Sequence, residues 1–194
     1  MKNKIIIVEG PQGVGKTTTV DYLRETIPHT NLFRLTGSND SSKRGLRKSV
    51  KFYENLLKFM KSMENTGMNL LFDRTFFTEE VYCRLGYKEY NFTKEYKRLL
   101  NKLSKLNFDT YYINLSLFDI NNYKQRLVRD GKANVTYAKF DISSSEKQQD
   151  IYLDLFAEIS TEYWATIKPR IFFTDTTTRE KLYSDIMGSI DWEY

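Results

Sequence analysis

The sequence predicts an α/β fold, a five-stranded parallel sheet with helices on both faces. Short apolar segments rich in β-branched and aromatic residues alternate with longer segments whose apolar residues recur at helical spacing. The first short segment, KIIIVE at residues 4–9, is apolar almost throughout, which is typical of a strand in the centre of a parallel sheet. A chain of 194 residues, 40% hydrophobic and 28% charged, can enclose such a sheet in a sizeable core.

In the first half of the chain, the longest helical pattern lies at residues 43–65. It places Val50, Tyr53, Leu57 and Met60 on one face, and Gly67 follows as a stop signal. The predicted order is a strand at 4–9, a glycine-rich loop at 10–15, a helix at 16–27, a strand at 31–36, a helix at 43–65 and a strand at 69–73.

In the second half, capping residues mark where helices begin. Asp119 precedes one helix, Ser143 and Glu146 have the spacing of a capping box, and Thr177 with Glu180 begins the last helix. The predicted order is helices at 76–85 and 92–106, a strand at 109–115, a helix after Asp119, an irregular segment at 130–142, a helix from Ser143, a strand at 170–174 and a helix from Thr177. No repeat or linker interrupts this order, so we expect one domain over residues 1–194.

Composition narrows the class of protein. No apolar run approaches the roughly 18–20 residues of a membrane span, so we expect no membrane association. A single cysteine, Cys83, and the lack of a targeting segment favour the cytoplasm. Residues 1–139 carry 25 Lys and Arg against 14 Asp and Glu, whereas residues 140–194 carry 5 against 11. This asymmetry fits anionic ligands, and it fits an ordinary solvated basic face equally well.

The most specific motif is G-x-x-x-x-G-K-T, from Gly10 to Thr17. Between a strand and a helix it predicts a phosphate-binding loop, because glycines let backbone N–H groups point at phosphate oxygens and the helix N-terminus adds partial positive charge. We expect Lys16 to reach the β- and γ-phosphates of ATP and the Thr17 hydroxyl to ligate Mg²⁺. The expected ATP contacts are Gln12, Gly13, Val14, Gly15, Lys16, Thr17 and Thr18.

Other charged residues are expected beside this loop. Asp73 ends the third strand, at the edge where α/β sheets bind ligands, and can orient Mg²⁺ or its water. Arg74 can hold a phosphate bidentately; the alternative is a surface ion pair with Asp73. Arg126 and Arg129 are expected to act in catalysis with residues 130–142 as a lid over the phosphates. The alternative is that they are ordinary cations at a helix C-terminus.

With these residues placed, nearly the whole chain resembles the thymidylate kinase branch of the P-loop nucleoside and nucleotide kinases. The similar segments are VEGPQGVGKTT, GMNLLFDRTFFTEEVY, FDTYYINLSLFDINNYKQRLVRDG and FFTDTTTREKL. The resemblance implies the P-loop kinase fold, ATP with Mg²⁺, a nucleotide substrate and a homodimer. It also implies substrate contacts by Glu9, Gln12 and Tyr82. Gln12 stands where the family has an acid that contacts the acceptor sugar, and Thr75 replaces the tyrosine after Asp-Arg.

The acceptor is inferred from the charges after the second strand. Residues 28–53 contain no Glu and one carboxylate, Asp40, but six Lys and Arg. A nucleoside needs a base to remove its hydroxyl proton, whereas a monophosphate is already ionised and needs cations. The balance favours a nucleoside monophosphate, which we expect Arg74 to hold, and the resemblance implies that this nucleotide is dTMP-like. Arg34 would support it from the second strand, which we expect beside the first. Phe52 is expected either to stack on the nucleobase or to pack in the core.

Three alternatives to a free monophosphate stay open. One is a deoxynucleoside acceptor, with Asp40 as the base. Another is a nucleotide within DNA, whose backbone the basic surface would hold, although the sequence does not favour nucleic acid. The third is a non-kinase ATPase or a regulatory binding module.

Overall fold

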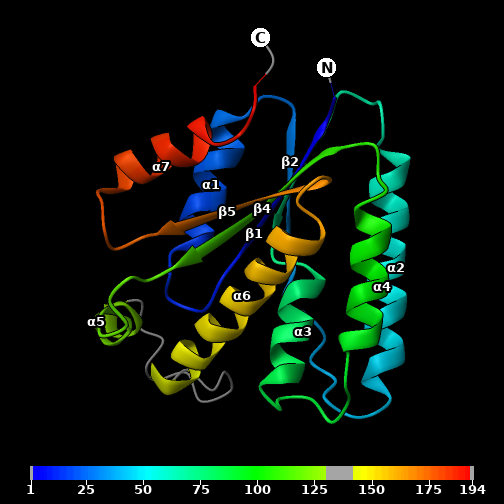
Figure 1. The fold of residues 1–194 in the computed structure, drawn as a ribbon, viewed down its shortest axis with the longest axis horizontal. Helices are drawn as coiled ribbons and strands as arrows, with labels where there is room; N and C mark the ends of the chain where they lie inside the picture. The colour runs from blue at the N-terminus through cyan, green and yellow to red at the C-terminus, as the bar shows by residue number, and fades with distance from the viewer. Residues whose placement is uncertain (1, 130–141, 193–194) are drawn as a thin grey trace.

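The computed structural model describes residues 2–129 and 142–192, and it contains a five-stranded sheet in which all neighbouring strands are parallel. The strands lie in the order β2-β3-β1-β4-β5 (Figure 1). They are β1 (Lys4–Glu9), β2 (Thr30–Arg34), β3 (Asn69–Asp73), β4 (Asp109–Ser116) and β5 (Ile167–Phe173). The predicted fold class is therefore confirmed.

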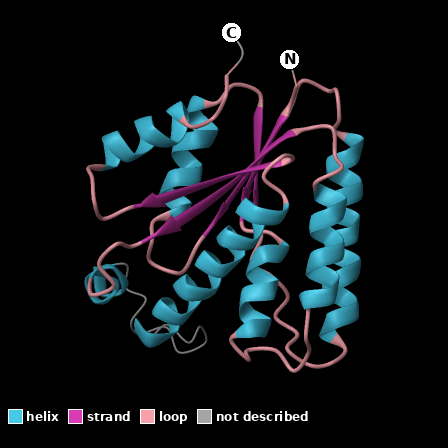
Figure 2. Cartoon of the chain, viewed as in Figure 1, coloured by secondary structure: helices cyan, strands magenta, loops and turns pink. Residues whose placement is uncertain are grey.

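Helices cover both faces of the sheet (Figure 2). The helices α2, α3, α4 and α6 pack in one core cluster, whereas α1, α5 and α7 contribute to the other. The helices are α1 (Lys16–Thr26), α2 (Gly45–Ser62), α3 (Phe76–Arg84), α4 (Thr93–Leu103), α5 (Asn122–Arg129), α6 (Ile142–Glu162) and α7 (Arg179–Gly188). None of the described helices is both long enough and apolar enough to cross a bilayer.

The central strand β1 explains why residues 4–9 are apolar almost throughout. Ile5 and Ile7 point into the core that contains α2, α3, α4 and α6, and Ile6 and Val8 point into the opposite core. All four side chains are fully buried. Alternate residues of a strand face opposite sides, so a strand covered on both sides needs apolar residues at every position.

The expectation that β2 lies beside β1 is wrong, because β3 lies between them. Leu71 of β3 pairs with Ile6 of β1 on one side and with Leu32 of β2 on the other. Four of the five residues of β3 are buried, whereas β2 has none that are fully buried. The more apolar strand therefore takes the interior position, and β2 forms an edge.

Several element boundaries differ from those predicted. β5 begins at Ile167, three residues early, because an edge strand tolerates Pro169. The N-cap of α7 is Thr178 rather than Thr177, and its side chain accepts a 3.3 Å hydrogen bond from the Lys181 backbone N–H. α6 begins at Ile142. The predicted lid at 130–142 otherwise lies outside the described residues.

Candidate active site

The glycine-rich loop takes the shape that its sequence predicts. Gly10, Gly13 and Gly15 all have φ between 85° and 141°, a region that favours glycine. A Cβ atom on Gly10 would lie 2.2 Å from the backbone oxygen of Leu115 in β4, so no larger residue fits there. Gly15 is the N-cap of α1, with φ 92°. The loop therefore brings backbone N–H groups and a helix N-terminus together, which suits phosphate oxygens.

Lys16 and Thr17 open helix α1 directly after this loop. Lys16 is buried, and its Nζ donates a 2.5 Å hydrogen bond to the Pro11 carbonyl, so the ammonium reaches across the loop. Thr17 and Thr18 are exposed to solvent and available to a ligand. Gln12 is half-buried, and no described group pairs with its side-chain oxygen. Contact of the residues from Gln12 to Thr18 with a polyphosphate chain stays a prediction.

Asp73 and Arg74 lie at the carboxyl edge of the sheet, next to the strand that leads into the loop. Asp73 is paired in register with Val8 of β1 and is 8% exposed. The Arg74 N–H donates to the Val8 carbonyl at 3.1 Å, and its φ is 73°. A non-glycine residue in this region carries backbone strain, which concentrates at functional sites. The strained turn gives Arg74 its fixed position after β3.

Glu9 lies at the centre of the site but is fully buried. Its carboxylate accepts hydrogen bonds from the Thr75 N–H (2.6 Å), from the Thr78 hydroxyl (2.7 Å) and from the Tyr152 hydroxyl (3.2 Å). Burial raises the pKa of Glu9 to about 7, although these hydrogen bonds and nearby Arg74 and Lys16 oppose the shift. The structure thus gives Glu9 bonds that join β1 to α3 and α6, and its predicted contact with substrate stays a prediction.

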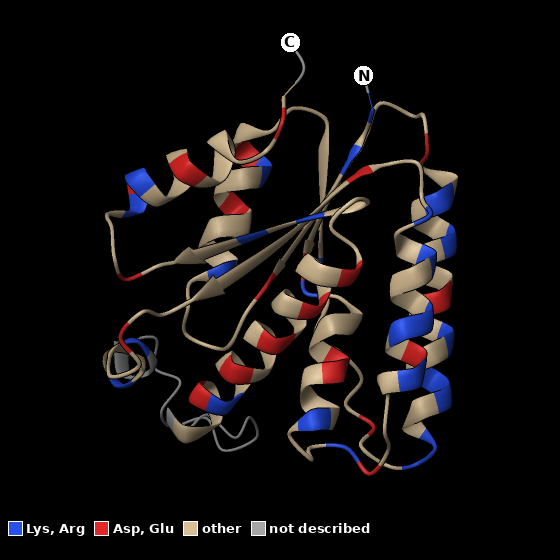
Figure 3. Cartoon of the chain, in the orientation of Figure 1, with Lys and Arg blue, Asp and Glu red and all other residues tan. Residues whose placement is uncertain are grey.

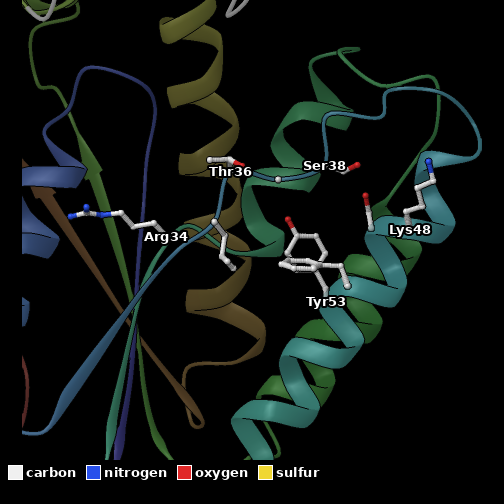
Figure 4. Close-up of a pocket in the computed structure, with 9 residues that line it drawn as sticks. Arg34, Thr36, Ser38, Lys48 and Tyr53 are labelled. Atoms are coloured by element: carbon white, nitrogen blue, oxygen red, sulfur yellow. The ribbon is translucent and has the colours of Figure 1, made fainter.

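A pocket of about 350 Å³ lies beyond the end of β2, on the face of the sheet covered by α2. We call it the acceptor pocket. It is lined by the segment 34–38 and by Lys48, Ser49, Phe52 and Tyr53 of α2 (Figure 4). The predicted substrate residue Phe52 is 49% exposed in its wall, so it is available to a ligand. The backbone N–H of Leu35 donates to the Asp73 carbonyl at 3.0 Å, which connects this pocket to the end of β3.

Glu79 of α3 forms a buried support behind the acceptor pocket. It accepts hydrogen bonds from the Ser38 N–H (3.2 Å), the Ser49 hydroxyl (3.4 Å) and the Tyr90 hydroxyl, and Lys88 lies 3.6 Å away. A Cβ atom on Gly37 would lie 3.3 Å from the Glu79 carboxylate. Glu79 therefore holds the segment after β2 in place. The sequence shows it only as one polar residue of a helix.

Arg34 lines the acceptor pocket, and both Arg34 and Asp40 form ion pairs within the protein. The Arg34 guanidinium forms an ion pair with Asp21 of α1, and Figure 4 shows its side chain directed away from Tyr53. Asp40 pairs with Lys48 at 2.6 Å and with the Ser42 hydroxyl at 2.6 Å. These bonds lower the pKa of Asp40 to about 2, so it is a poor base at neutral pH.

A second pocket, of about 200 Å³, borders the phosphate loop. We call it the donor pocket, and it contains Gly15, Thr18, Arg126, Thr174 and Arg179 among its lining residues. The Arg126 guanidinium donates to the Thr174 hydroxyl (2.6 Å) and carbonyl (2.8 Å), which fixes it beside the loop. Arg129 is the last residue of α5, and its side chain lies outside the described part.

No group of three or more His, Cys, Asp or Glu side chains that could hold a metal ion occurs within residues 2–129 and 142–192. Mg²⁺ in phosphate-transfer sites needs only one or two protein oxygens, because phosphates and water supply the rest. The exposed Thr17 hydroxyl and the Asp73 carboxylate, beside the loop, fit that limited role.

Some contacts of the site could not be found from the sequence. Tyr152 is 143 positions away from Glu9 along the chain. Tyr82, a predicted substrate residue, lies on α3 close to Arg74. Burial lowers the pKa of Arg74, but Tyr82 and other neighbouring groups raise it, and the net shift is upward. Thr174 follows β5 in the segment FFTDTTTREKL, and the family resemblance of that segment is its only signal in the sequence.

Comparisons with known proteins agree with this geometry at the level of the fold. No protein-family model matches the sequence, and no curated protein matches it either. Among solved structures, deoxyadenosine kinase from M. mycoides with dCMP and dCDP superposes with a TM-score of 0.60 at 15% identity, covering 95% of this chain and 97% of that one. Thymidylate kinase from Candida albicans gives 0.59 at 14% identity, covering 96% and 90%.

A third similar structure, Polyphosphate Kinase 2 from Arthrobacter aurescens, gives a TM-score of 0.63 at 16% identity and covers 97% of this chain and 66% of that one. The chain therefore has the fold shared by these P-loop kinases.

Proposed function

We propose that this protein is an ATP-dependent nucleoside monophosphate kinase that transfers the γ-phosphoryl group of ATP to a dTMP-like nucleotide. The observation that carries the proposal is the position of Arg74. It follows β3 in a strained turn hydrogen-bonded to β1, the strand that leads into the phosphate loop, and the end of β3 just before it is hydrogen-bonded to Leu35 in the lining of the acceptor pocket. Two of the similar structures are kinases of nucleosides or nucleotides.

In this mechanism the protein binds the two substrates, orients them and neutralises the charge of their phosphates. The loop N–H groups and Lys16 hold the donor phosphates, and Arg126 fixes the donor side through Thr174. Arg74 holds the acceptor phosphate and offsets the repulsion between the two anions. Mg²⁺, when bound, neutralises phosphate charge, and Thr17 and Asp73 are the residues that would hold it. The attacking phosphate oxygen is already ionised, so no protein base is required.

The carboxylates near the acceptor pocket support a monophosphate rather than a nucleoside. Asp40 has a pKa of about 2 and is paired with Lys48. Glu9 and Glu79 are fully buried, and each accepts several hydrogen bonds. None of the three is placed as an accessible base for a sugar hydroxyl. The predicted homodimer and cytoplasmic location have no bearing on this argument and stay predictions.

The proposal is tested by assaying ATP and Mg²⁺ with a panel of nucleosides and their monophosphates. We expect phosphorylation of a monophosphate, and an Arg74→Lys variant slower by on the order of 10²-fold, because lysine loses the bidentate contact while keeping the charge. Arg24→Lys, on the exposed face of α1, is the matched control and should match wild type. Faster phosphorylation of a nucleoside than of its monophosphate would show that the acceptor assignment is wrong.

A further inference from the structure

Helices α2 and α4 concentrate positive charge in one part of the molecule. Residues 44–62 and 93–105, which contain the two helices, carry eleven Lys and Arg against two Glu, a net of +9, although the whole chain has a net charge of only +5. The helices pack side by side, and Figure 3 shows many Lys and Arg residues along both of them. The remaining residues are therefore net negative, so this charge belongs to the two helices rather than to the protein as a whole.

A groove of about 420 Å³ lies between these helices, and we call it the lysine groove. Four lysines line it, two from α2 and two from the end of α4 and the turn that follows: Lys58, Lys61, Lys102 and Lys105. Glu54, also in the lining, pairs with Lys102 at 3.2 Å and with Arg98. The other three lysines of the groove form no ion pair within residues 2–129 and 142–192. The groove therefore has an excess of positive charge that the described residues do not neutralise.

The four lysines are suited to a ligand that carries repeated negative charges. Cations gathered in a concave surface raise the local electrostatic potential and attract anions. All four side chains are exposed to solvent, so an anion reaches them without a change in the fold. A lysine ammonium is a point charge on a flexible stem, and it does not require the planar geometry that the arginine fork imposes. The groove can therefore follow a row of charges whose exact positions vary.

The residues that line the groove favour a phosphate backbone over other anionic partners. Among the residues that the structure describes, none that lines the groove is aromatic, whereas proteins that hold single-stranded nucleic acid stack bases on aromatic side chains. Leu57 is 5% exposed, and no exposed large hydrophobic residue in that part of the chain lines the groove. The groove thus offers no anchor for a membrane or for the apolar centre of a protein interface. A second copy packed here by a two-fold axis would place these lysines against themselves.

The arrangement of the lysines fits a duplex. Packed helices lie about 8–10 Å apart, so α2 and α4 present two rows of lysines that can reach the phosphates on both sides of a minor groove about 6 Å wide. Within each row the lysines are three residues apart, which is about 4.5 Å along a helix axis, and a duplex strand presents a phosphate about every 3.4 Å. Contacts to phosphates position a protein on a duplex and carry no sequence information.

We propose that the lysine groove binds the phosphate backbone of a nucleic-acid duplex without regard to sequence. The groove is lined on α2 by residues from Glu54 onward, whereas the acceptor pocket is lined on α2 by residues up to Tyr53. The duplex is therefore a partner that the protein holds while the acceptor pocket stays open, and it is not the acceptor itself. This binding does not depend on the proposed function, because it requires neither ATP nor a phosphoryl acceptor.

The test measures binding of a fluorescein-labelled DNA duplex of about 20 base pairs by fluorescence anisotropy, at salt concentrations from about 50 mM to about 200 mM. The groove variant carries four substitutions that remove charge and keep a long polar side chain: Lys58→Gln, Lys61→Gln, Lys102→Gln and Lys105→Gln. Glu54 keeps its pair with Arg98, so we expect this variant to melt near the wild-type temperature. The matched control loses four charges at exposed residues of α1, α5, α6 and α7: Arg24→Gln, Lys124→Gln, Lys147→Gln and Lys181→Gln.

The salt dependence reports the number of phosphate contacts, because each contact contributes about 0.9 to the slope of log Kd against log salt concentration. We expect the groove variant to lower this slope by about 3 to 4 and to weaken binding at about 50 mM salt on the order of tenfold or more. Lys58→Gln with Lys61→Gln alone should lower the slope by about 2. The control should keep the wild-type slope and bind within about threefold of wild type, because charges beyond about a Debye length are screened.

Two results would overturn the inference: a wild-type protein that does not bind the duplex at about 50 mM salt, and a control whose slope falls as much as that of the groove variant. Unlabelled competitors identify the partner. We expect the duplex to displace the labelled duplex better than a single strand of the same sequence or polyglutamate of equal charge. Better displacement by polyglutamate would assign the groove to an acidic protein instead, and better displacement by the single strand would contradict the duplex.

Kinase assays keep this inference distinct from the proposed function. The KM values of the acceptor and of ATP should be the same in the groove variant and in wild type, and a saturating duplex should leave both unchanged. A duplex that raises the acceptor KM of wild type would contradict its placement in the lysine groove. Loss of all phosphorylation by wild type would overturn the proposed function, whereas the inference would still be decided by the binding measurements.

Discussion

At the scale of single residues, Glu9 connects three elements of the candidate site. It is fully buried, and it joins the end of β1 to the start of α3 through Thr75 and Thr78 and to α6 through Tyr152. Its pKa of about 7 lies above the ordinary value of 4.5 because burial disfavours the charged form. The protein therefore holds a carboxyl that ionises near neutral pH among the residues that position Arg74.

This raised pKa predicts a pH-dependent stability. Below pH 4.5 the Glu9 carboxyl is protonated in both the folded and the unfolded state, so its stabilising contribution to the free energy of unfolding is at its maximum. As the pH rises to about 7, the unfolded state releases this proton first, and the free energy of unfolding falls by about 3 kcal/mol from this residue. Urea unfolding of wild type and Glu9→Gln at pH 4.5 and pH 7 measures the difference.

In Glu9→Gln the free energy of unfolding should fall much less between pH 4.5 and pH 7 than in wild type, because glutamine does not titrate. Glu25→Gln, on the exposed face of α1, is the control and should keep the wild-type pH dependence. If Glu9→Gln showed the same decrease as wild type, the decrease would have to come from other groups.

Lys16 should be essential to catalysis rather than to folding. It spans the loop to the Pro11 carbonyl, where its ammonium can reach a transferring phosphate. Lys16→Ala is expected to lower kcat by on the order of 10²-fold or more, because charge stabilisation in the transition state is lost. Steady-state kinetics on the folded variant, beside the exposed control Lys94→Ala, measure the effect. Near wild-type turnover of Lys16→Ala would remove this residue from the mechanism.

At the scale of elements, the close approach of the glycine loop to β4 limits which residues the loop accepts. Gly10 lies against the Leu115 carbonyl with φ 141°, and that carbonyl belongs to a central strand that cannot move aside easily. The loop conformation therefore depends on packing against the sheet as well as on the flexibility of glycine.

Substitution at two glycines should have opposite effects on stability. Gly10→Ala brings a Cβ atom to 2.2 Å from backbone and is expected to lower the free energy of unfolding by about 2 kcal/mol or more. Gly188→Ala, at the end of α7, meets no atom within 4 Å and should raise it by up to about 1 kcal/mol. Chemical denaturation of both variants tests the pair, and equal effects would contradict the assigned contact.

At the scale of the whole molecule, charge is separated along the fold. Figure 3 shows many Lys and Arg residues along α2 and α4 and many Asp and Glu residues along α6. The lysine groove of about 420 Å³ between α2 and α4 is lined by Lys58, Lys61, Lys102 and Lys105. These lysines lie near the ends of helices that lead into β3 and β4, at the edge of the sheet opposite the phosphate loop. This groove is separate from the acceptor pocket, which the preceding part of α2 lines.

Substrate binding should therefore show only a weak dependence on salt. A mononucleotide carries few charges, whereas a nucleic acid held by many phosphate contacts loses affinity by about 0.9 of a log unit per contact for each log unit of salt. We expect KM values for mononucleotides to change little between low and physiological salt, and oligonucleotides not to compete for the acceptor pocket. Steep salt dependence with an oligonucleotide acceptor would instead favour a kinase acting on DNA.

The sequence by itself determined the local features of this protein. The glycine loop, the apolar β1 and the Asp73–Arg74 pair after β3 were all predicted, because each depends on residues adjacent in the chain. Strand β3 was predicted at its observed residues, since its apolar run is short and has polar residues at both ends. The local sequence predicts where glycine is needed and which face of a helix is apolar. Both features are the same whatever the arrangement of the elements in space.

The tertiary structure alone decided which distant residues meet. The position of β3 between β1 and β2 places β2 at the edge, and Arg34 pairs there with Asp21 of α1. It also decided that Tyr152 reaches Glu9 and that Tyr53 keeps a buried hydroxyl without a partner in the described residues. Such contacts depend on how much apolar surface each strand buries and on how the helices then pack, and both are properties of the assembled sheet rather than of any one segment.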